Sequence, residues 1–150
     1  MKISATSTDT LVTYSLGSCI GVAIYDPVVK VGGMLHYMLP DASINKDKGV
    51  KNPYMFANTG IPLLFKTCYQ HGAEKKRLVV KVAGGGQIMD ESGVFNIGKR
   101  NYAILRKMFW KNNILIDSED IGGMVNRTMY LRLSDGQLML KVSKKGLVEL

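Results

Sequence analysis

Two apolar segments of strand length, separated by a five-residue turn, constrain the fold of this chain more than any other feature. Residues 20–25 read Ile-Gly-Val-Ala-Ile-Tyr and residues 31–38 read Val-Gly-Gly-Met-Leu-His-Tyr-Met, with Asp-Pro-Val-Val-Lys between them. Short apolar runs bounded by turn formers are typical of buried strands. Because the two runs follow each other so closely, we predict an antiparallel hairpin inside a sheet.

This hairpin is predicted to bring a thiol and an imidazole together. Cys19 directly precedes the first strand, and His36 lies near the end of the second. In an antiparallel pair, the start of one strand lies beside the end of its partner. A cysteine is largely protonated at neutral pH and becomes a good nucleophile when a neighbouring base accepts its proton. We place Thr13 at the end of the preceding strand, where its hydroxyl could orient the second ring nitrogen of His36.

The turn before Cys19 is built from small residues that suit an oxyanion site. Gly17 can adopt a positive φ, and a tight turn at Gly17 and Ser18 would direct successive N–H groups into one concavity. A purely structural interpretation stays open at this point. Free cysteines usually behave as small buried hydrophobes, and a single histidine on an apolar strand is usually a satisfied core group.

Five sequence blocks resemble the CheD family, the chemoreceptor glutamine deamidases of bacterial and archaeal chemotaxis, and they occur in the family's order. The blocks are residues 13–19 (TYSLGSC), 32–40 (GGMLHYMLP), 83–86 (AGGG), 96–101 (NIGKRN) and 120–128 (DIGGMVNRT). Ser15 and Asn126 stand at positions where glycine is common in the family. Neither departure falls on Cys19, His36 or Thr13.

The resemblance implies a function and roles for three residues. Cys19 would be the nucleophile, His36 the general base and acid, and Thr13 the residue that orients His36. The reaction implied is conversion of receptor glutamine to glutamate through a thioester, with release of ammonia and without a cofactor. Some family members also hydrolyse glutamyl methyl esters. The implied partners are the cytoplasmic helices of chemoreceptors (methyl-accepting chemotaxis proteins) and a CheC-type phosphatase that acts on phosphorylated CheY.

An alternative from another functional class is a non-catalytic regulatory binding partner of that phosphatase. The sequence identifies no residues for binding substrate or partner. Its net charge of +8 is spread over scattered lysines and arginines without a nucleic-acid-binding motif, so we predict no nucleic-acid partner. We also expect a cytoplasmic location without membrane insertion, because there is no apolar run of spanning length and no signal-peptide pattern.

The resemblance implies an α/β (α+β) fold with α/β/β/α layers and mixed, largely antiparallel sheets, similar to the catalytic domain of cytotoxic necrotizing factor toxins. With 150 residues, 46% of them hydrophobic, we expect one deamidase domain over 1–150. Periodicity predicts helices within 54–71 and after Asn96. Further strands are predicted at 78–83, 114–120, 128–133 and 137–142, and residues 41–53 are predicted to form a mobile loop.

Two further patterns have structural interpretations. The glycines at 84–86 follow a strand but lack a phosphate-binding motif, so we predict close backbone packing beside the active site. Asp117, Glu119 and Asp120 have no histidine nearby and no EF-hand spacing, so we interpret them as structural and predict no metal site. Cys68 is predicted to be a core thiol on a helix.

Overall fold

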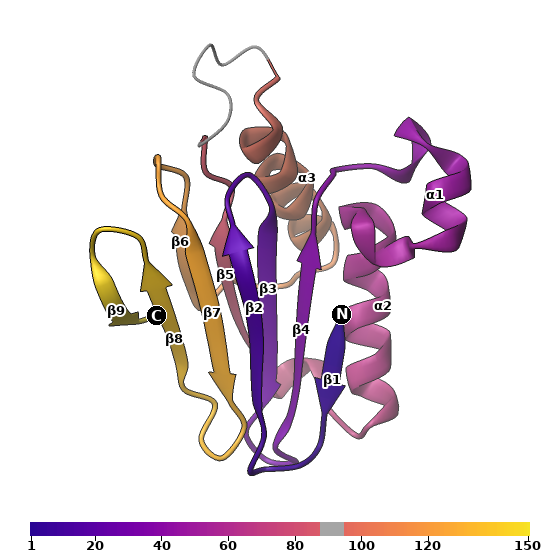
Figure 1. The fold of residues 1–150 in the computed structure, drawn as a ribbon. Coiled ribbons are helices and arrows are strands. Elements are labelled where there is room, and N and C mark those ends of the chain that lie inside the picture. Colours follow the sequence, from indigo (N-terminus) through magenta and orange to yellow (C-terminus); the bar gives the residue numbers. More distant parts are fainter. Residues whose placement is uncertain (88–94) are drawn as a thin grey trace.

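The computed structural model describes residues 1–87 and 95–150, and its framework is a pair of β-sheets (Figure 1). One sheet has five strands in the order β1-β4-β3-β5-β6, and the other has four in the order β2-β7-β8-β9. Only the β5–β6 pair is parallel among the described strands. The five-stranded sheet consists of β1 (Lys2–Ser4), β3 (Ile20–Asp26), β4 (Val31–Tyr37), β5 (Val79–Gly84) and β6 (Ser118–Ile121). The four-stranded sheet consists of β2 (Thr10–Leu16), β7 (Arg127–Arg132), β8 (Leu138–Val142) and β9 (Gly146–Glu149).

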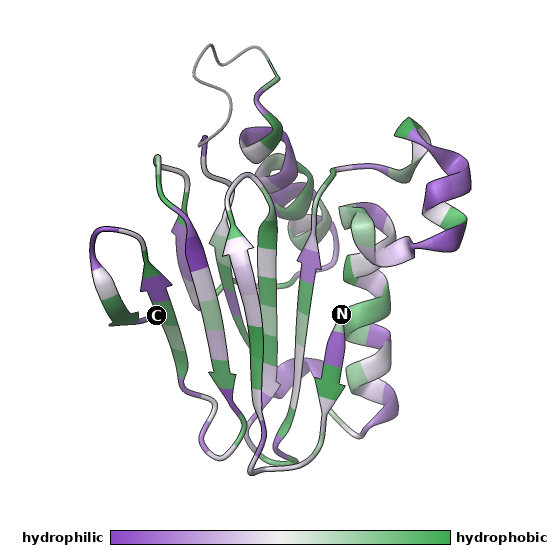
Figure 2. Cartoon of the chain, viewed as in Figure 1, coloured by the Kyte–Doolittle hydropathy of each residue, from purple (hydrophilic) through white to green (hydrophobic). Residues whose placement is uncertain are grey.

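The predicted hairpin is confirmed as β3 and β4, at the centre of the five-stranded sheet. The two strands pair antiparallel in one continuous register, with Gly21 opposite His36. All residues of β3 are buried. Helices cover one face of this sheet and the second sheet covers the other, which explains why β3 is apolar from Ile20 to Tyr25 (Figure 2) rather than alternating.

Two long helices, α2 (Ala57–Gln70) and α3 (Ile97–Lys111), pack on the five-stranded sheet. Leu64 and Phe65 of α2 and Leu105 of α3 join the sheet residues Val22 and Leu35 in one core. A second core fills the space between the sheets and includes Leu16, Met34, Met129 and Leu131. In the described part of the chain, no helix is long and apolar enough to cross a membrane.

The layering differs from the expected α/β/β/α arrangement. Among residues 1–87 and 95–150, both long helices lie against the five-stranded sheet, so the layers are helices, mixed sheet and antiparallel sheet (Figure 1). The outer face of the four-stranded sheet carries exposed or half-buried side chains such as Tyr14, Tyr130 and Lys141. Because this face is polar or amphipathic, it does not require a covering helix.

Several segment boundaries also differ from the predictions. Residues 41–53 contain a 3-10 turn (Ala42–Ile44) and the short helix α1 (Lys46–Lys51) instead of a loop, because Asp41 and Asn45 cap the first turns with their side chains. Two further 3-10 turns are Pro53–Met55 and Lys75–Arg77. The strand predicted at 114–120 is confined to Ser118–Ile121, and β1 and β9 were not predicted.

Candidate active site

Cys19 lies in the turn that connects β2 in one sheet to β3 in the other. Its side chain is partly buried and packs against the core between the sheets. Backbone hydrogen bonds fix the turn from the β5 side: Gly85 N–H donates to the Cys19 carbonyl at 2.9 Å, and Gly86 N–H donates to the Gly17 carbonyl at 2.7 Å. The thiol is therefore held at the end of the sandwich where β2 ends and β3 begins.

His36 lies on the same side of the five-stranded sheet as Cys19. It pairs with Gly21, two residues after Cys19, and directly opposed residues point to the same face. A side chain on Gly21 would meet Met129 and Leu16, so this face is the one between the sheets. Diagonal neighbours in such a pair are about 7–8 Å apart, within reach of a long side chain. The hairpin thus places the imidazole and the thiol on the face between the sheets, and their predicted proximity stays a prediction.

Thr13 contacts His36 from the opposite sheet. Its Oγ1 lies 3.0 Å from His36 Nδ1, so the predicted contact is present. The predicted position of Thr13 at the end of its strand is wrong, because β2 continues to Leu16 with a register shift between Thr13 and Leu16. Since β2 pairs with β7 and not with β3, this hydrogen bond joins the two sheets at the candidate site.

Burial keeps both the thiol and the imidazole in their neutral forms. It raises the pKa of Cys19, an effect that a hydrogen bond from the residue's own backbone only partly offsets. Burial also lowers the pKa of His36, with a smaller contribution from the positive charge of the Met1 amino group. Neither group is therefore charged at neutral pH, so His36 would act by accepting the thiol proton during attack rather than by holding a preformed thiolate.

The turn differs in detail from the prediction for Gly17. The positive φ occurs at Ser15 (φ 57°), whereas Gly17 does not have one, and Gly17 N–H is engaged by the Ser15 carbonyl at 3.0 Å. That N–H is therefore not free to bind an oxyanion. Within residues 1–87 and 95–150, the backbone N–H of Ser18 has no protein acceptor, and the N–H of Cys19 has none other than the thiol of its own residue. These two groups are the available donors at the turn.

The glycine run after β5 packs closely against the Cys19 turn, as predicted. Gly84 has φ 121°, and a Cβ there would lie 2.1 Å from the Cys19 carbonyl oxygen. Gly85 also has a positive φ of 65°. From the other side, Gly98 in the first turn of α3 approaches so closely that a Cβ would lie 2.4 Å from the Gly85 carbonyl oxygen. Glycine is required here because the backbones of three segments touch.

Asn101 is a residue near the candidate site that the sequence analysis did not identify. It lies on α3, is fully buried, and its Nδ2 donates to the carbonyls of Ser18 at 3.0 Å and Met38 at 2.8 Å. The available signal was its position three residues after Gly98 and four before Leu105, on the apolar face of the helix. A polar residue at such a position needs buried partners.

The acidic cluster has the predicted structural role. Asp117 accepts a hydrogen bond from Val80 N–H at 2.7 Å, and Glu119 accepts one from the Tyr102 hydroxyl at 2.8 Å. Asp120 pairs with the buried Arg127, whose Nε lies 3.0 Å from the carboxylate, and this ion pair joins β6 to β7. The described residues contain no group of three or more His, Cys, Asp or Glu side chains suited to a metal ion.

Cys68 is confirmed as a core thiol on α2. It is fully buried, and burial raises its pKa to about 12. The two cysteines are both free. A thiol with this pKa and no exposure has neither the ionisation nor the access that nucleophilic attack requires. Cys19 is therefore the reactive candidate of the two.

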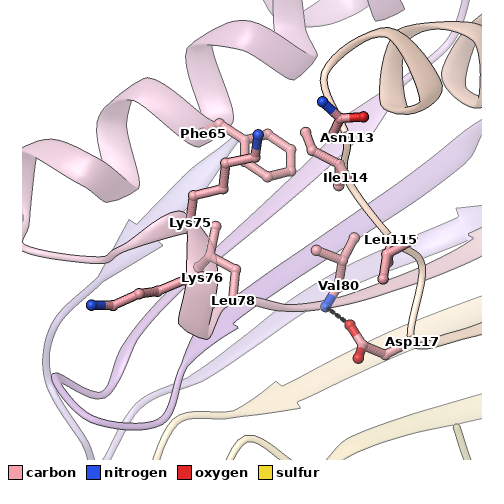
Figure 3. A pocket seen from close by; sticks show the side chains of 9 residues that line it. All are labelled: Phe65, Lys75, Lys76, Leu78, Val80, Asn113, Ile114, Leu115 and Asp117. Atoms are coloured by element: carbon pink, nitrogen blue, oxygen red, sulfur yellow. Dashed lines mark hydrogen bonds between the residues drawn. The ribbon is translucent and has the colours of Figure 1, made fainter.

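One hollow in the described part of the chain lies away from Cys19. It has a volume of about 520 Å³ and lies between α2, the start of β5 and residues 113–117, with Phe65, Lys75 and Leu115 among its walls (Figure 3). Val80 belongs to this hollow, whereas Gly84 at the other end of β5 packs on the Cys19 turn. Its position separates it from the thiol and imidazole.

Comparisons with known proteins agree with the sequence blocks. A family model described as CheD chemotactic sensory transduction matches residues 38–142. The "Probable chemoreceptor glutamine deamidase CheD 1" of Syntrophus aciditrophicus is 57% identical over 149 residues, covering 99% of this chain and 93% of the relative. The "Probable chemoreceptor glutamine deamidase CheD" of Solibacter usitatus is 52% identical over 135 residues, covering 90% of this chain and 80% of the relative. The chain therefore belongs to the CheD family.

Proposed function

We propose that this chain is a protein-glutamine deamidase that acts on glutamine side chains of chemoreceptors, with Cys19, His36 and Thr13 as its catalytic residues. The observation that carries the proposal is the 3.0 Å contact between Thr13 Oγ1 and His36 Nδ1, on the sheet face that also carries Cys19. The printed names of the relatives describe the same activity. Together these observations support a nucleophile, a base and a group that orients the base.

The first half of the reaction forms a thioester. With His36 Nδ1–H donated to Thr13 Oγ1, the Nε2 lone pair accepts the thiol proton as Cys19 Sγ attacks the amide carbon. The tautomer is assigned from this role. The N–H groups of Ser18 and Cys19 stabilise the oxyanion of the tetrahedral intermediate. The C–N bond then breaks, His36 returns the proton to the departing nitrogen, and ammonia leaves.

The second half releases the acid. Neutral His36 accepts a proton from water as the oxygen attacks the thioester carbonyl, and the C–S bond breaks to restore the Cys19 thiol with the returned proton. The product is a glutamate, so each turnover adds one negative charge to the receptor. The residues of the site supply all the proton transfers, and the proposal requires no cofactor.

Mass spectrometry of receptor cytoplasmic fragments tests this proposal. The wild-type chain should raise the mass of specific glutamine peptides by about 1 Da, the amide-to-acid change of the nucleophilic route. Cys19→Ala should produce no shift, whereas Cys68→Ala, which removes the buried thiol, should retain it. A shift that persists in Cys19→Ala would contradict the assignment of the nucleophile.

We also propose a cytoplasmic setting, where the receptor's signalling helices are accessible, and a CheC-type phosphatase as a regulatory partner. Membership in the family supports this partnership. If the chain instead has only the regulatory role, Cys19→Ala will leave phosphatase binding unchanged and no receptor glutamine will change mass. The activity is assigned to one domain over residues 1–150, and the similarity of its fold to the cytotoxic necrotizing factor toxins stays a prediction.

A further inference from the structure

We propose that Asn101 is a positioning residue that keeps the Cys19 turn and the His36 strand at the separation that proton transfer requires. This inference rests on the proposed function, because it concerns the same thiol and imidazole. A single NH₂ group donates to the Ser18 carbonyl at 3.0 Å and to the Met38 carbonyl at 2.8 Å. Ser18 directly precedes Cys19, and Met38 lies two residues after His36. One amide therefore bridges the two segments that carry the reacting groups.

The orientation of this amide is determined by its partners. Both are carbonyl oxygens, which only accept hydrogen bonds, so the nitrogen and not the oxygen of Asn101 must face them. Asn101 has no exposed surface, and its Oδ1 has no hydrogen-bond partner among the described residues. An unpaired buried polar atom destabilises a fold by about 1–3 kcal/mol. The bridge therefore satisfies two carbonyls while one acceptor stays unpaired, so the residue is not optimised for stability alone.

Asn101 is itself held in place by its neighbours. Its backbone carbonyl accepts a hydrogen bond from the buried Tyr37 hydroxyl at 2.8 Å, which ties α3 to the strand that carries His36. One helical turn earlier, Gly98 packs against Gly85, whose N–H binds the Cys19 carbonyl. Because α3 is bound to the His36 strand through the Tyr37 hydroxyl and to the Cys19 turn through Gly85, the amide extends from a fixed support.

A purely structural role would have a different signature. If Asn101 only satisfies two strand-end carbonyls, its loss lowers stability without changing how His36 affects Cys19. If Asn101 positions Cys19 and His36, removing its side chain slows the reaction of Cys19 only in a chain that retains His36. A double-mutant cycle separates these cases, because two residues that act through one contact give non-additive effects.

The experiment measures the rate at which iodoacetamide alkylates Cys19 at neutral pH, resolved by peptide so that Cys68 is counted separately. We expect His36→Ala and Asn101→Ala each to slow the reaction by about tenfold or more, because proton transfer to a positioned base contributes about 10²- to 10⁴-fold. The double variant should react no more slowly than His36→Ala alone. Tyr25→Phe is the matched control: it loses one buried hydrogen bond, 2.9 Å to the Leu133 carbonyl, at the far end of β3, and should react like wild type. Asn101→Ser retains one donor and should be intermediate, which keeps the test usable if Asn101→Ala does not fold.

The outcomes distinguish this inference from the proposed function. Independent, multiplying effects in the double variant would overturn the positioning role, and so would Asn101 variants that behave like Tyr25→Phe. If His36→Ala slows alkylation and the Asn101 variants do not, only the positioning role fails. If His36→Ala leaves the rate unchanged, the assignment of His36 as base fails and the positioning role fails with it.

Discussion

Replacing Thr13 by valine tests the contact between the two sheets. Valine has nearly the same shape as threonine but lacks the oxygen that lies 3.0 Å from His36 Nδ1. The ring would then lose its hydrogen bond to the four-stranded sheet, and its tautomer would no longer be fixed. We therefore expect a slower reaction with little change in substrate binding, because Thr13 touches the base and not the substrate in this mechanism.

The expected magnitude follows from how this hydrogen bond changes during catalysis. A hydrogen bond between neutral groups contributes about 0.5–1.5 kcal/mol, and one to a charged group about 1.5–3 kcal/mol. His36 is neutral at rest and becomes an imidazolium when it accepts the thiol proton, so the bond strengthens by about 1–2 kcal/mol in the transition state. Since about 1.36 kcal/mol corresponds to a tenfold change, kcat should fall by about 5- to 30-fold.

Ammonia release from receptor fragments, with kcat and KM determined separately, measures this effect. Thr67→Val is the matched control, because it removes a hydroxyl that donates to the Leu63 carbonyl at 2.7 Å on α2, remote from Cys19. It should lower the free energy of unfolding by about 1 kcal/mol, which is the usual contribution of a hydrogen bond between neutral groups, and leave kcat unchanged. A wild-type kcat in Thr13→Val, or an equal drop in the kcat of Thr13→Val and Thr67→Val, would refute the reasoning.

Three further predictions concern the stability of the fold. Ser15→Gly should raise the free energy of unfolding by about 0.5–1 kcal/mol in urea titrations, because it relieves a left-handed serine at φ 57°; a destabilised variant would contradict this. Gly84→Ala should lower the free energy of unfolding by about 3 kcal/mol or more, since its Cβ would lie 2.1 Å from the Cys19 carbonyl oxygen at a φ of 121°. A wild-type urea midpoint would refute this prediction. Burial would raise the pKa of Asp26, but hydrogen bonds from Arg77 and three backbone N–H groups lower it to about 2. Its stabilising contribution should therefore be complete above about pH 4 and be lost as the pH falls towards 2, and Asp26→Asn should remove that part of the pH dependence.

The local part of the site could be predicted from the sequence, whereas the part that depends on tertiary pairing could not. The β3–β4 hairpin follows from two apolar runs and a short turn, so the placement of Cys19 and His36 at the same end of this hairpin is encoded within residues 19–36. The partner strand of β2 cannot be predicted from such a local pattern. It pairs with β7, more than a hundred residues later, and only this pairing shows that Thr13 reaches His36 from a second sheet.

The details of the turn and the buried polar contacts also could not be predicted from the sequence. A positive φ was predicted at Gly17, but the structure places it at Ser15. Asn101 was part of a recognised sequence block, yet its bridge between Ser18 and Met38 depends on how α3 docks against two strand ends. Helix docking of this kind is set by packing between distant segments, which periodicity does not encode.

Capture of the acyl-enzyme tests the central claim most directly. Hydroxylamine added during turnover should intercept a thioester on Cys19 and convert part of the receptor product from glutamate to glutamyl hydroxamate, in the Cys68→Ala variant as in wild type. Ammonia release should continue, and Cys19→Ala should yield neither product. Continued formation of glutamate without any hydroxamate, or hydroxamate formation by Cys19→Ala, would contradict a covalent mechanism at this residue.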